Sequence, residues 1–260
     1  MNIQKNMFDL TGKNAIVVGG AGGIGQAIAQ GLAMYGAHVC IASRKEESLQ
    51  RAQAEIKADS GCDVGYYTVD AGNEDSVKAL SEKAIAELGH IDILVNAQGF
   101  NKKFPITEFD GTVWDQMFNV NVKSVMLTMK YFGRHMRDDI GGGKIINLSS
   151  VRGIRACGGG NTGYGATKGA VDMLTRMGAK DLGPTVYVNA IGPTITYTPM
   201  MVGILPADPK ERAAKAANMP LQRIGEPEDC VGPAIFLASD ASNFVSGQII
   251  YPDGGLTAMG

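Results

Sequence analysis

The sequence predicts a doubly wound α/β fold, with a parallel sheet of about seven strands, helices on both faces and a single domain. Short runs rich in β-branched residues alternate with longer amphipathic stretches along the whole chain. Strands that alternate with helices are joined by crossovers, which makes neighbouring strands parallel. The 260 residues, 45% of them hydrophobic and 19% charged, suit one domain with a large core.

The N-terminal part of the pattern is a strand, a glycine-rich turn and a helix. Residues 14–18 (NAIVV) are typical of a buried strand, and the glycine-rich segment 19–25 follows directly. The helix begins within this segment, because Ile24, Ile28 and Leu32 form one apolar stripe.

The remaining elements follow from periodicity and from helix-start signals. Ser43 and Glu46 are spaced as a capping box for a second helix, Asn73 can cap a third, and Pro227 suits the first turn of the last one. Helices are expected at 43–58, 73–88, 112–137, 164–181 and 227–237, and further strands at 39–42, 64–69, 91–95, 144–148, 186–191 and 247–251.

The Pro-rich stretch 192–220 is expected to be irregular. We predict that residues 194–220 fold over the substrate as a lid, in which Met200, Met201 and Ile204 exclude water from the reacting carbon.

Composition excludes several classes of protein. The net charge of −2 gives no global signal for nucleic acid or for an anionic membrane, and no stretch is long and apolar enough to span a bilayer. The four cysteines form no Cys-x-x-Cys pair and the three histidines are far apart, so we expect no metal site. Residues 1–10 contain Lys5 and Asp9 and no apolar run, so we expect a cytoplasmic protein without a secretory signal.

The glycine-rich segment predicts a dinucleotide site. It follows a strand and opens a helix, where glycines let the backbone approach a pyrophosphate and the helix N-terminus attracts it. The second strand ends in Ser43-Arg44-Lys45, without the carboxylate that would bind the ribose of NAD. Arg44 and Ser43 can instead bind a 2′-phosphate, which favours NADP, with NAD as the alternative.

A second constellation predicts proton transfer. Tyr164 and Lys168 are four residues apart and therefore share one face of the helix at 164–181. A nearby ammonium lowers the pKa of a phenol, and Ser150, at the end of the fifth strand, can bind the reacting oxygen. The alternative is an amphipathic helix with a packed tyrosine.

At this point the chain resembles the short-chain dehydrogenase/reductase family over nearly its whole length. The matching residues are Gly19, Gly23, Gly25, Asp70, Asn96, Gly99, Val120-Asn121-Val122, Asn147-Leu148-Ser149-Ser150, Tyr164, Lys168, Asn189-Ala190-Ile191-Gly192-Pro193 and Asp253-Gly254-Gly255. The resemblance implies a Rossmann-type fold and hydride transfer between a nicotinamide cofactor and a carbonyl or secondary alcohol.

The resemblance also implies roles for single residues. Tyr164 is expected to be the general acid or base, Ser150 to hold the substrate oxygen, Lys168 to bind the nicotinamide ribose and depress the pKa of Tyr164, and Asn121 to hold a relay water. The expected cofactor-binding residues are Gly19, Gly23, Ile24, Gly25, Ser43, Arg44, Asp70, Ala71, Asn96, Tyr164, Lys168, Pro193 and Thr198.

Within the family, the chain resembles the sugar-acid and polyol branch, such as gluconate 5-dehydrogenases, in residues 101–109 and 168–176. Lys102 and Lys103 follow the fourth strand, and Arg152 and Arg155 follow the fifth, so four cations border one crevice. We therefore expect an anionic small-molecule substrate, with solvated loop charges as the alternative.

Three other functions are weighed against this one. They are an NAD-dependent enzyme acting on a neutral or apolar ketone, a non-catalytic NADP-binding sensor, and an enoyl reductase. A sensor would be expected to lack Ser150, Tyr164 or Lys168, and an enoyl reductase to have a longer Tyr-to-Lys spacing.

The resemblance finally implies a homotetramer. The helices at 112–137 and 164–181 would pack across one two-fold axis, and residues 247–260 would build another. Met173 and Met177 would form an adaptable apolar patch there, with core packing inside the monomer as the alternative.

Overall fold

The computed structural model describes residues 6–198, 201, 205–217 and 219–259. Its strands are β1 (Asn14–Val18), β2 (His38–Ser43), β3 (Gly65–Thr68), β4 (Ile93–Asn96), β5 (Gly143–Leu148), β6 (Val186–Ile191) and β7 (Ile249–Ile250). Its α-helices are α1 (Gly23–Met34), α2 (Glu46–Ser60), α3 (Glu74–Leu88), α4 (Gly111–Phe118), α5 (Ser124–Asp138), α6 (Thr162–Leu182), α7 (Pro209–Lys215) and α8 (Val231–Ala238).

The seven strands form one parallel sheet in the order β3-β2-β1-β4-β5-β6-β7, which confirms the predicted fold class. The strand order reverses between β1 and β4, where Val18 pairs with Ala42 on one side and with Asn96 on the other. In such sheets ligands bind beyond the carboxyl ends of the strands at this reversal.

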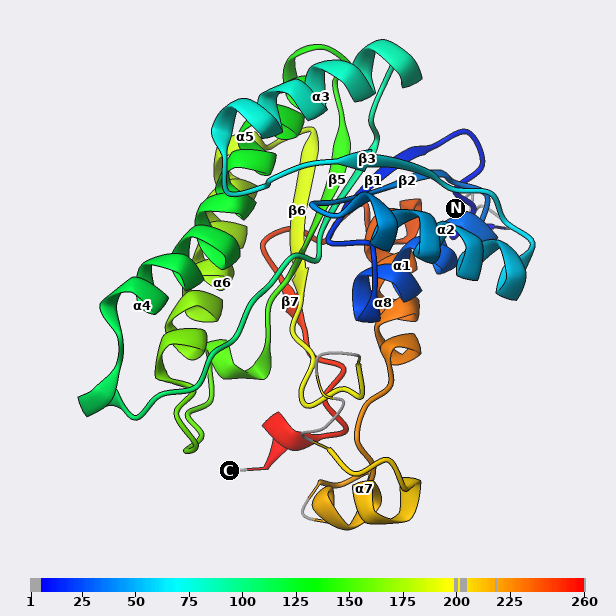
Figure 1. Ribbon diagram of the computed structural model, residues 1–260. Coiled ribbons are helices and arrows are strands. Elements are labelled where there is room, and N and C mark those ends of the chain that lie inside the picture. Colours follow the sequence, from blue (N-terminus) through cyan, green and yellow to red (C-terminus); the bar gives the residue numbers. More distant parts are fainter. Residues whose placement is uncertain (1–5, 199–200, 202–204, 218, 260) are drawn as a thin grey trace.

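Helices cover both faces of the sheet (Figure 1). On one face α1, α2 and α8 enclose a core that includes Ile28, Leu32 and Ile56. On the other face α3, α5 and α6 enclose a second core around Leu80, Phe132 and the helix α6. Every residue of β1 is buried, because both faces of this central strand are covered.

Several boundaries match their sequence signals. The bounds of β1 and β6 are those predicted, and Asn73 caps α3 by accepting a hydrogen bond from the Ser76 amide at 3.0 Å. The Ser43–Glu46 capping box is wrong, because Lys45 is the N-cap residue of α2 and no side chain caps that helix.

The helical pattern at 112–137 is interrupted. A π-helical turn, Asn119–Lys123, separates α4 from α5. The last predicted helix begins as a 3-10 turn at Pro227–Cys230 before α8. Within the stretch expected to be irregular, Asp208 accepts a hydrogen bond from the Lys210 amide and starts the short helix α7.

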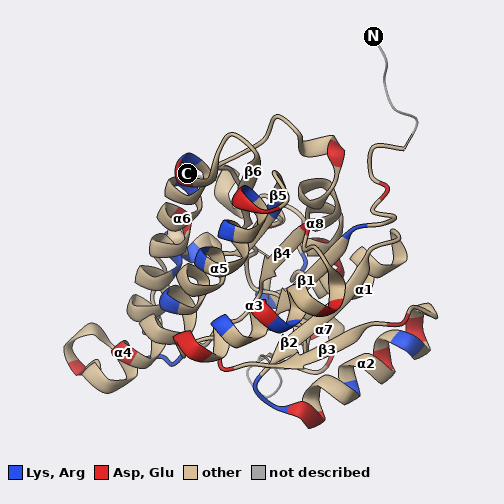
Figure 2. Cartoon of the chain, turned by 90° about the horizontal axis from the view of Figure 1, so that it is seen from above, with Lys and Arg blue, Asp and Glu red and all other residues tan. Residues whose placement is uncertain are grey.

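Among the described helices none has the length and apolar character needed to cross a membrane. Along the chain, Lys and Arg residues are interspersed with Asp and Glu residues (Figure 2).

Candidate active site

The carboxyl ends of β1, β4 and β5 bring three predicted segments to one edge of the sheet (Figure 1). The glycine-rich turn follows β1, residues 97–104 follow β4, and Ser149 and Ser150 follow β5. The first turns of α6 lie beside the 3-10 turn Val151–Gly153, so Tyr164 and Lys168 face the same edge. Residues far apart in the sequence thus border one site.

The glycine-rich turn has the shape of a phosphate cradle. Gly19 has a φ of 83°, and a Cβ there would clash with the backbone of Gln98. Gly25 packs against Gly19 and Ala97 in the same way. Gly22, the N-cap residue of α1, faces open space and no side chain caps the helix. The first amide groups of α1, including those of Gly23 and Ile24, therefore suit a pyrophosphate anion.

The end of β2 borders the position where the adenosine ribose of a dinucleotide would lie. Ser43 is half-buried at the last position of the strand, and Arg44 and Lys45 are exposed. Glu46 and Glu47 follow in the first turn of α2, and the Glu46 carboxylate accepts from the Tyr66 hydroxyl at 3.2 Å. The strand end itself carries a hydroxyl and two cations and no carboxylate.

Tyr164 and Lys168 lie one turn apart on α6, as their spacing predicts. The Lys168 Nζ atom is 5.5 Å from the centroid of the Tyr164 ring. It donates a hydrogen bond of 2.6 Å to the carbonyl oxygen of Leu148, the last residue of β5. Lys168 is only 3% exposed, and burial lowers its pKa to about 8, opposed by the negative charge of Asp172. The ammonium is thus held beside the phenol at the end of the central sheet.

The Ser150 hydroxyl lies next to the same phenol. It donates to the Pro193 carbonyl at 3.2 Å and accepts from the Arg152 amide at 3.2 Å. Burial raises the pKa of Tyr164 to about 12, while hydrogen bonding to Ser150 and the positive charge of Arg152 act in the opposite direction. At neutral pH Tyr164 therefore carries its proton, which suits a general acid.

Asn121 lies in the π-helical turn and is fully buried. Its Oδ1 atom accepts from the Phe100 amide at 2.7 Å, and its Nδ2 atom donates to the Phe100 carbonyl at 2.8 Å and to Thr167 at 3.0 Å. A Cβ built on Gly99 would be 3.9 Å from the Lys168 Nζ atom and 4.0 Å from the Asn121 Oδ1 atom. Asn121 and Lys168 therefore converge on Gly99. π-turns of this kind are frequent at functional sites.

The predicted adenine contacts lie in the turn after β3. Asp70 is exposed, and its Oδ1 atom accepts from the Gly72 amide at 3.1 Å, while Ala71 is half-buried beside it. Asn96 is fully buried, donates to Asn147 at 2.9 Å and accepts from Thr128 at 2.7 Å. Its side chain thus joins β4 to β5 and α5, and only the backbone at 96–99 is free to line a cofactor cleft.

The predicted carboxamide contacts follow β6. Pro193 is buried and its carbonyl accepts from the Val151 amide at 3.1 Å as well as from Ser150. Thr198 is half-buried. Pro193 therefore fixes the loop after β6 against the residues that follow β5.

The four predicted substrate cations have different surroundings. Lys102 and Lys103 are exposed, and the Lys102 Nζ atom lies 5.4 Å above the Phe104 ring. The Arg155 guanidinium donates to the carbonyl of Leu256 near the C-terminus. Arg152 is half-buried and acts electrostatically on Tyr164. Of the four, Arg152 is therefore the cation coupled to the Tyr164 phenol.

The described residues of the segment 194–225 form an extension that encloses a small hydrophobic core. Leu205, Ala216, Met219 and Ile224 are buried together there. The two stems of the extension are joined, because the Tyr197 amide donates to the Gly225 carbonyl and the Gly225 amide donates to the Ile195 carbonyl. Met201 packs against the small core, whereas Met200 and Ile204 lie outside the described residues.

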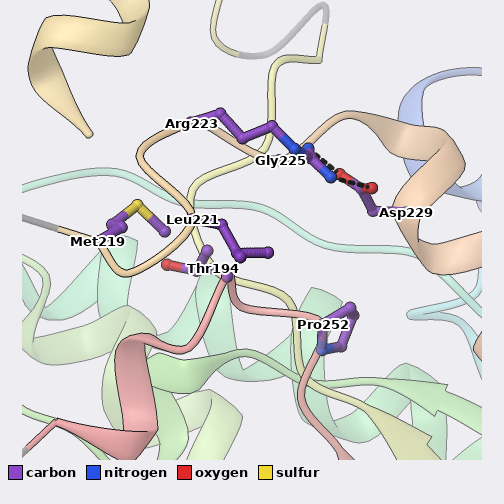
Figure 3. Close-up of a pocket in the computed structure, with 8 residues that line it drawn as sticks. Thr194, Met219, Leu221, Arg223, Gly225, Asp229 and Pro252 are labelled. Atoms are coloured by element: carbon purple, nitrogen blue, oxygen red, sulfur yellow. Dashed lines mark hydrogen bonds and ion pairs between the residues drawn. The ribbon is translucent and has the colours of Figure 1, made fainter. Parts of the chain in front are cut away.

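A cavity of about 180 Å³ lies where this extension meets the C-terminal segment (Figure 3). Thr194, Leu221 and Pro252 line it, and Arg223 forms a bidentate pair with Asp229 at its border, at 2.6 and 2.7 Å. A larger cavity, of about 740 Å³, lies among Lys13, Lys144 and Asp240, at the amino ends of the strands. It is at the opposite end of the sheet from Tyr164 and plays no part in the site.

Sequence reasoning missed part of the site. Asp172 is buried on the face of α6 that carries Tyr164 and Lys168, and it accepts a hydrogen bond from Ser149. Thr167 connects Asn121 to the Tyr164 carbonyl. The spacing of Asp172, four residues after Lys168, was the signal that could have identified it.

The chain matches one protein-family model and is similar to many known proteins. Residues 19–257 match the model described as "Enoyl-(Acyl carrier protein) reductase". The gluconate 5-dehydrogenase of Gluconobacter oxydans (strain 621H) is 37% identical over 253 residues, which cover 97% of each chain. The cis-4-hydroxycyclohexanecarboxylate dehydrogenase of Sinomonas cyclohexanicum is 40% identical over 248 residues, which cover 94% of this chain and 96% of the relative.

A solved structure is also similar to this chain in sequence and in fold. The gluconate 5-dehydrogenase of Burkholderia cenocepacia J2315, in complex with NADP and tartrate, superimposes with a TM-score of 0.89. It is 34% identical, and the match covers 98% of this chain and 99% of that one.

Proposed function

Because the chain belongs to the short-chain dehydrogenase/reductase family, we propose that it transfers a hydride between NADP(H) and a small polar hydroxy or keto compound that carries an anionic group. The family makes it an NAD(P)-dependent oxidoreductase acting on CH–OH groups. The observation that carries the proposal is the convergence of Tyr164, Lys168 and Ser150 at the carboxyl end of β5.

The reduction follows from the chemistry of these side chains. When bound, the nicotinamide supplies the hydride that adds to the carbonyl carbon. The Ser150 hydroxyl holds the carbonyl oxygen, and the Tyr164 phenol gives that oxygen its proton as the C=O π bond breaks. Tyr164 recovers a proton from solvent along the side that carries Lys168 and Asn121. In the oxidation the proton moves in the reverse direction.

This chemistry distinguishes carbonyl reduction from reduction of an enoyl double bond. The matching family model is named for an enoyl reductase, whereas the two relatives described above are dehydrogenases of hydroxy acids by name. The four-residue spacing of Tyr164 and Lys168 and the adjacent Ser150 hydroxyl support a reacting oxygen atom.

The end of β2 supports NADP as the cofactor. Arg44 and Ser43 can bind a 2′-phosphate, and the strand ends without the carboxylate that would repel it. NADP is also the cofactor in the similar Burkholderia structure. NAD remains the second candidate, to be separated by the Arg44 substitution described in the Discussion.

Arg152 supports an anionic substrate. Its guanidinium follows Ser150 and lies close enough to Tyr164 to favour the phenolate electrostatically. A carboxylate on the substrate would form a charge-assisted pair there, with Lys102 and Lys103 further out. Arg155 has a smaller part in this proposal, because Leu256 already binds it. Gluconate, 4-hydroxycyclohexanecarboxylate and tartrate, named for the three similar proteins, are all carboxylates.

A paired substrate assay tests the proposal. NADPH oxidation should be faster with keto acids than with the matching neutral keto-alcohols, and Arg152→Ala should reduce this preference about 10-fold or more, since one charge-assisted pair is lost. Arg137→Ala, at the far end of α5, is the matched control and should leave the preference unchanged.

Equal rates with acids and neutral ketones, unchanged by Arg152→Ala, would favour the second candidate, an enzyme acting on neutral or apolar ketones. An absence of turnover with every carbonyl and alcohol, despite NADPH binding, would favour a non-catalytic sensor.

We also propose that residues 194–220 act as a lid. The small core and the joined stems of the described residues support a lid that covers the substrate, with Leu256 of the C-terminal segment packed against this core. Met201, on the edge of that core, is the described member of the apolar group expected to exclude water.

The exposed methionines of α6 support assembly into a homotetramer. Met173 and Met177 are 55% and 53% exposed, and Met126 of α5 is 39% exposed. The alternative prediction, that Met173 and Met177 pack in the core of the monomer, is therefore wrong. Unbranched thioether side chains suit an adaptable apolar contact between copies of α5 and α6.

Light scattering tests the assembly. The native protein should have four times the 27.4 kDa mass of the monomer at micromolar concentration. Met173→Asp should shift the protein to smaller species, because it places a charge in an apolar contact. Met34→Asp, at an equally exposed methionine of α1, should not. A native monomer would refute the proposal.

We infer a cytoplasmic location, where the four free cysteines would remain reduced.

A further inference from the structure

Asp172 is a buried carboxylate on the face of α6 that carries Tyr164 and Lys168. It lies four residues after Lys168 and eight after Tyr164, on the same face of the helix. Only 2% of its surface is exposed. Acidic side chains are rarely buried to this degree unless they are bound by partners, so the contacts of Asp172 require an explanation.

Three segments around the active site contact this carboxylate. The Ser149 hydroxyl donates a hydrogen bond to its Oδ1 atom, and the Tyr251 hydroxyl, just after β7, donates to its Oδ2 atom at 3.5 Å. A Cβ on Gly153 would be 2.7 Å from the Oδ2 atom, so the turn after Ser150 must be glycine there to approach Asp172. Asp172 therefore joins α6 to the ends of β5 and β7.

The ammonium group of Lys168 is buried in the same region as Asp172, so its charged form requires a nearby negative charge. Its Nζ atom donates to the Leu148 carbonyl, and none of the ion pairs within 4.0 Å in the described part of the chain includes it. Burial favours the neutral amine and lowers the Lys168 pKa to about 8, and the negative charge of Asp172 is what raises it. Residues four apart on a helix have Cβ atoms about 5–6 Å from one another.

We propose that Asp172 is a positioning residue of the active site: its carboxylate holds Ser149, and hence the strand end that carries Ser150, and supplies the negative charge that keeps Lys168 an ammonium ion. The proposal rests on the proposed function, in which Lys168 binds the nicotinamide ribose. It adds a third position, after Tyr164 and Lys168, to the face of α6 that serves catalysis.

The other charged and titratable groups around this pair are few. Arg176 lies one turn further along α6, Tyr164 one turn before Lys168, Arg152 on the turn after Ser150, and Tyr251 after β7. Arg176 and Lys168 both favour the ionised form of Asp172, as does the Ser149 hydrogen bond, against the burial that raises its pKa. Asp172 is thus the one acidic side chain in this described group.

The pH dependence of NADPH binding tests the electrostatic part. Asp172→Asn keeps the size and the acceptor for Ser149 but removes the charge. In the native protein the NADPH Kd should begin to rise above about pH 8, where the free protein loses the Lys168 proton. In Asp172→Asn this rise should begin about one pH unit lower, as expected for loss of one nearby charge. Asp181→Asn removes an exposed carboxylate from the same helix and is the matched control.

A cofactor-free measurement gives a second readout. Lys168 has a lower pKa folded than unfolded, so its own contribution to stability should rise from about pH 8 towards 10.5. The contributions of other groups with shifted pKa values, such as Lys144 and Cys230, are common to the native protein and the variant, so the comparison of the two curves isolates Lys168. In Asp172→Asn this increase in Tm should also begin about one unit lower. Superimposable native and Asp172→Asn curves in both experiments would overturn the proposal, as would an equal shift in Asp181→Asn.

Ser149→Ala tests the positioning part. It removes the hydroxyl but leaves the charge, so kcat should fall about 2- to 10-fold, the equivalent of one hydrogen bond, while the pH at which the NADPH Kd rises stays native. An unchanged kcat in Ser149→Ala would remove the positioning role. If the native protein binds neither NADPH nor NADH, the proposed function fails, and that outcome is distinct from native binding with an unshifted Asp172→Asn curve.

Discussion

Replacing Tyr164 by phenylalanine is expected to lower kcat by about 10²–10⁴-fold or more while leaving the Kd for NADPH nearly unchanged. The phenylalanine ring fills the same position on α6 but carries no transferable proton. Lys168, whose Nζ atom lies 5.5 Å from the ring centroid, keeps its hydrogen bond to Leu148. The measurement is steady-state turnover together with fluorescence titration of NADPH.

The control for this experiment is Tyr35→Phe. Tyr35 is 48% exposed at the end of α1, so loss of its hydroxyl should change neither kcat nor binding. A Tyr164→Phe protein with near-native kcat would show that the catalytic assignment is wrong. A protein that loses NADPH binding as well would indicate a structural role for the hydroxyl instead.

Replacing Arg44 by alanine is expected to raise the KM for NADPH about 10- to 100-fold and to leave the KM for NADH nearly unchanged. The substitution removes a charge-assisted pair with the 2′-phosphate, which is worth roughly 1.5–3 kcal/mol. Arg44 is exposed at the end of β2, so the substitution should not change folding. The measurement is the ratio of kcat/KM for the two cofactors.

Arg51→Ala is the matched control for the cofactor. Arg51 lies on α2, seven residues after Arg44, and its side chain is 65% exposed. It should leave the preference for NADPH unchanged. Equal use of NADH by the native enzyme would contradict the NADP assignment at once, and an Arg44→Ala protein with native KM values would show that Arg44 does not contact the phosphate.

The sheet could be predicted from the sequence because its signals are local. Residues 14–18 and 186–191 are short apolar runs, and both faces of a parallel strand are covered by helices. A run of this kind cannot be mistaken for a half-exposed strand, so the bounds of β1 and β6 match. The strand order is a finding of the structure, since right-handed crossovers restrict the possible orders without selecting one.

The helix boundaries were less predictable, because several local signals compete. Ser43 and Glu46 have capping-box spacing, but Ser43 pairs as the last residue of β2 and cannot also begin α2. The Asp208-Pro209 start of α7 is a standard helix signal, yet it lies in a Pro-rich stretch that suggested irregular structure. Strand pairing of Ser43 thus determines where α2 begins, whereas capping by Asp208 determines where α7 begins.

The residues of the candidate site also fall into two groups, those that local sequence patterns predict and those that only the fold brings together. The Tyr164–Lys168 face follows from helix periodicity. The partner of Arg155 does not, because Leu256 is 101 residues away and reaches Arg155 only through the fold. The sequence places Lys102 and Lys103 in the loop after β4, on the side expected to bind the substrate. Their exposure and the contact of Lys102 with the Phe104 ring depend on packing and could be known only from the structure.

The π-helical turn Asn119–Lys123 has a consequence for how this helix can evolve. Such a turn contains one residue more than a regular helical turn, so removing one residue there would restore an unbroken helix from α4 to α5. The shortened helix would gain regular hydrogen bonding, but Asn121 would rotate by about 100° away from Phe100 and Thr167. The deletion that makes the helix regular would thus remove the polar contacts of Asn121 beside Lys168, so a regular helix and the geometry of the proposed site exclude one another at this turn.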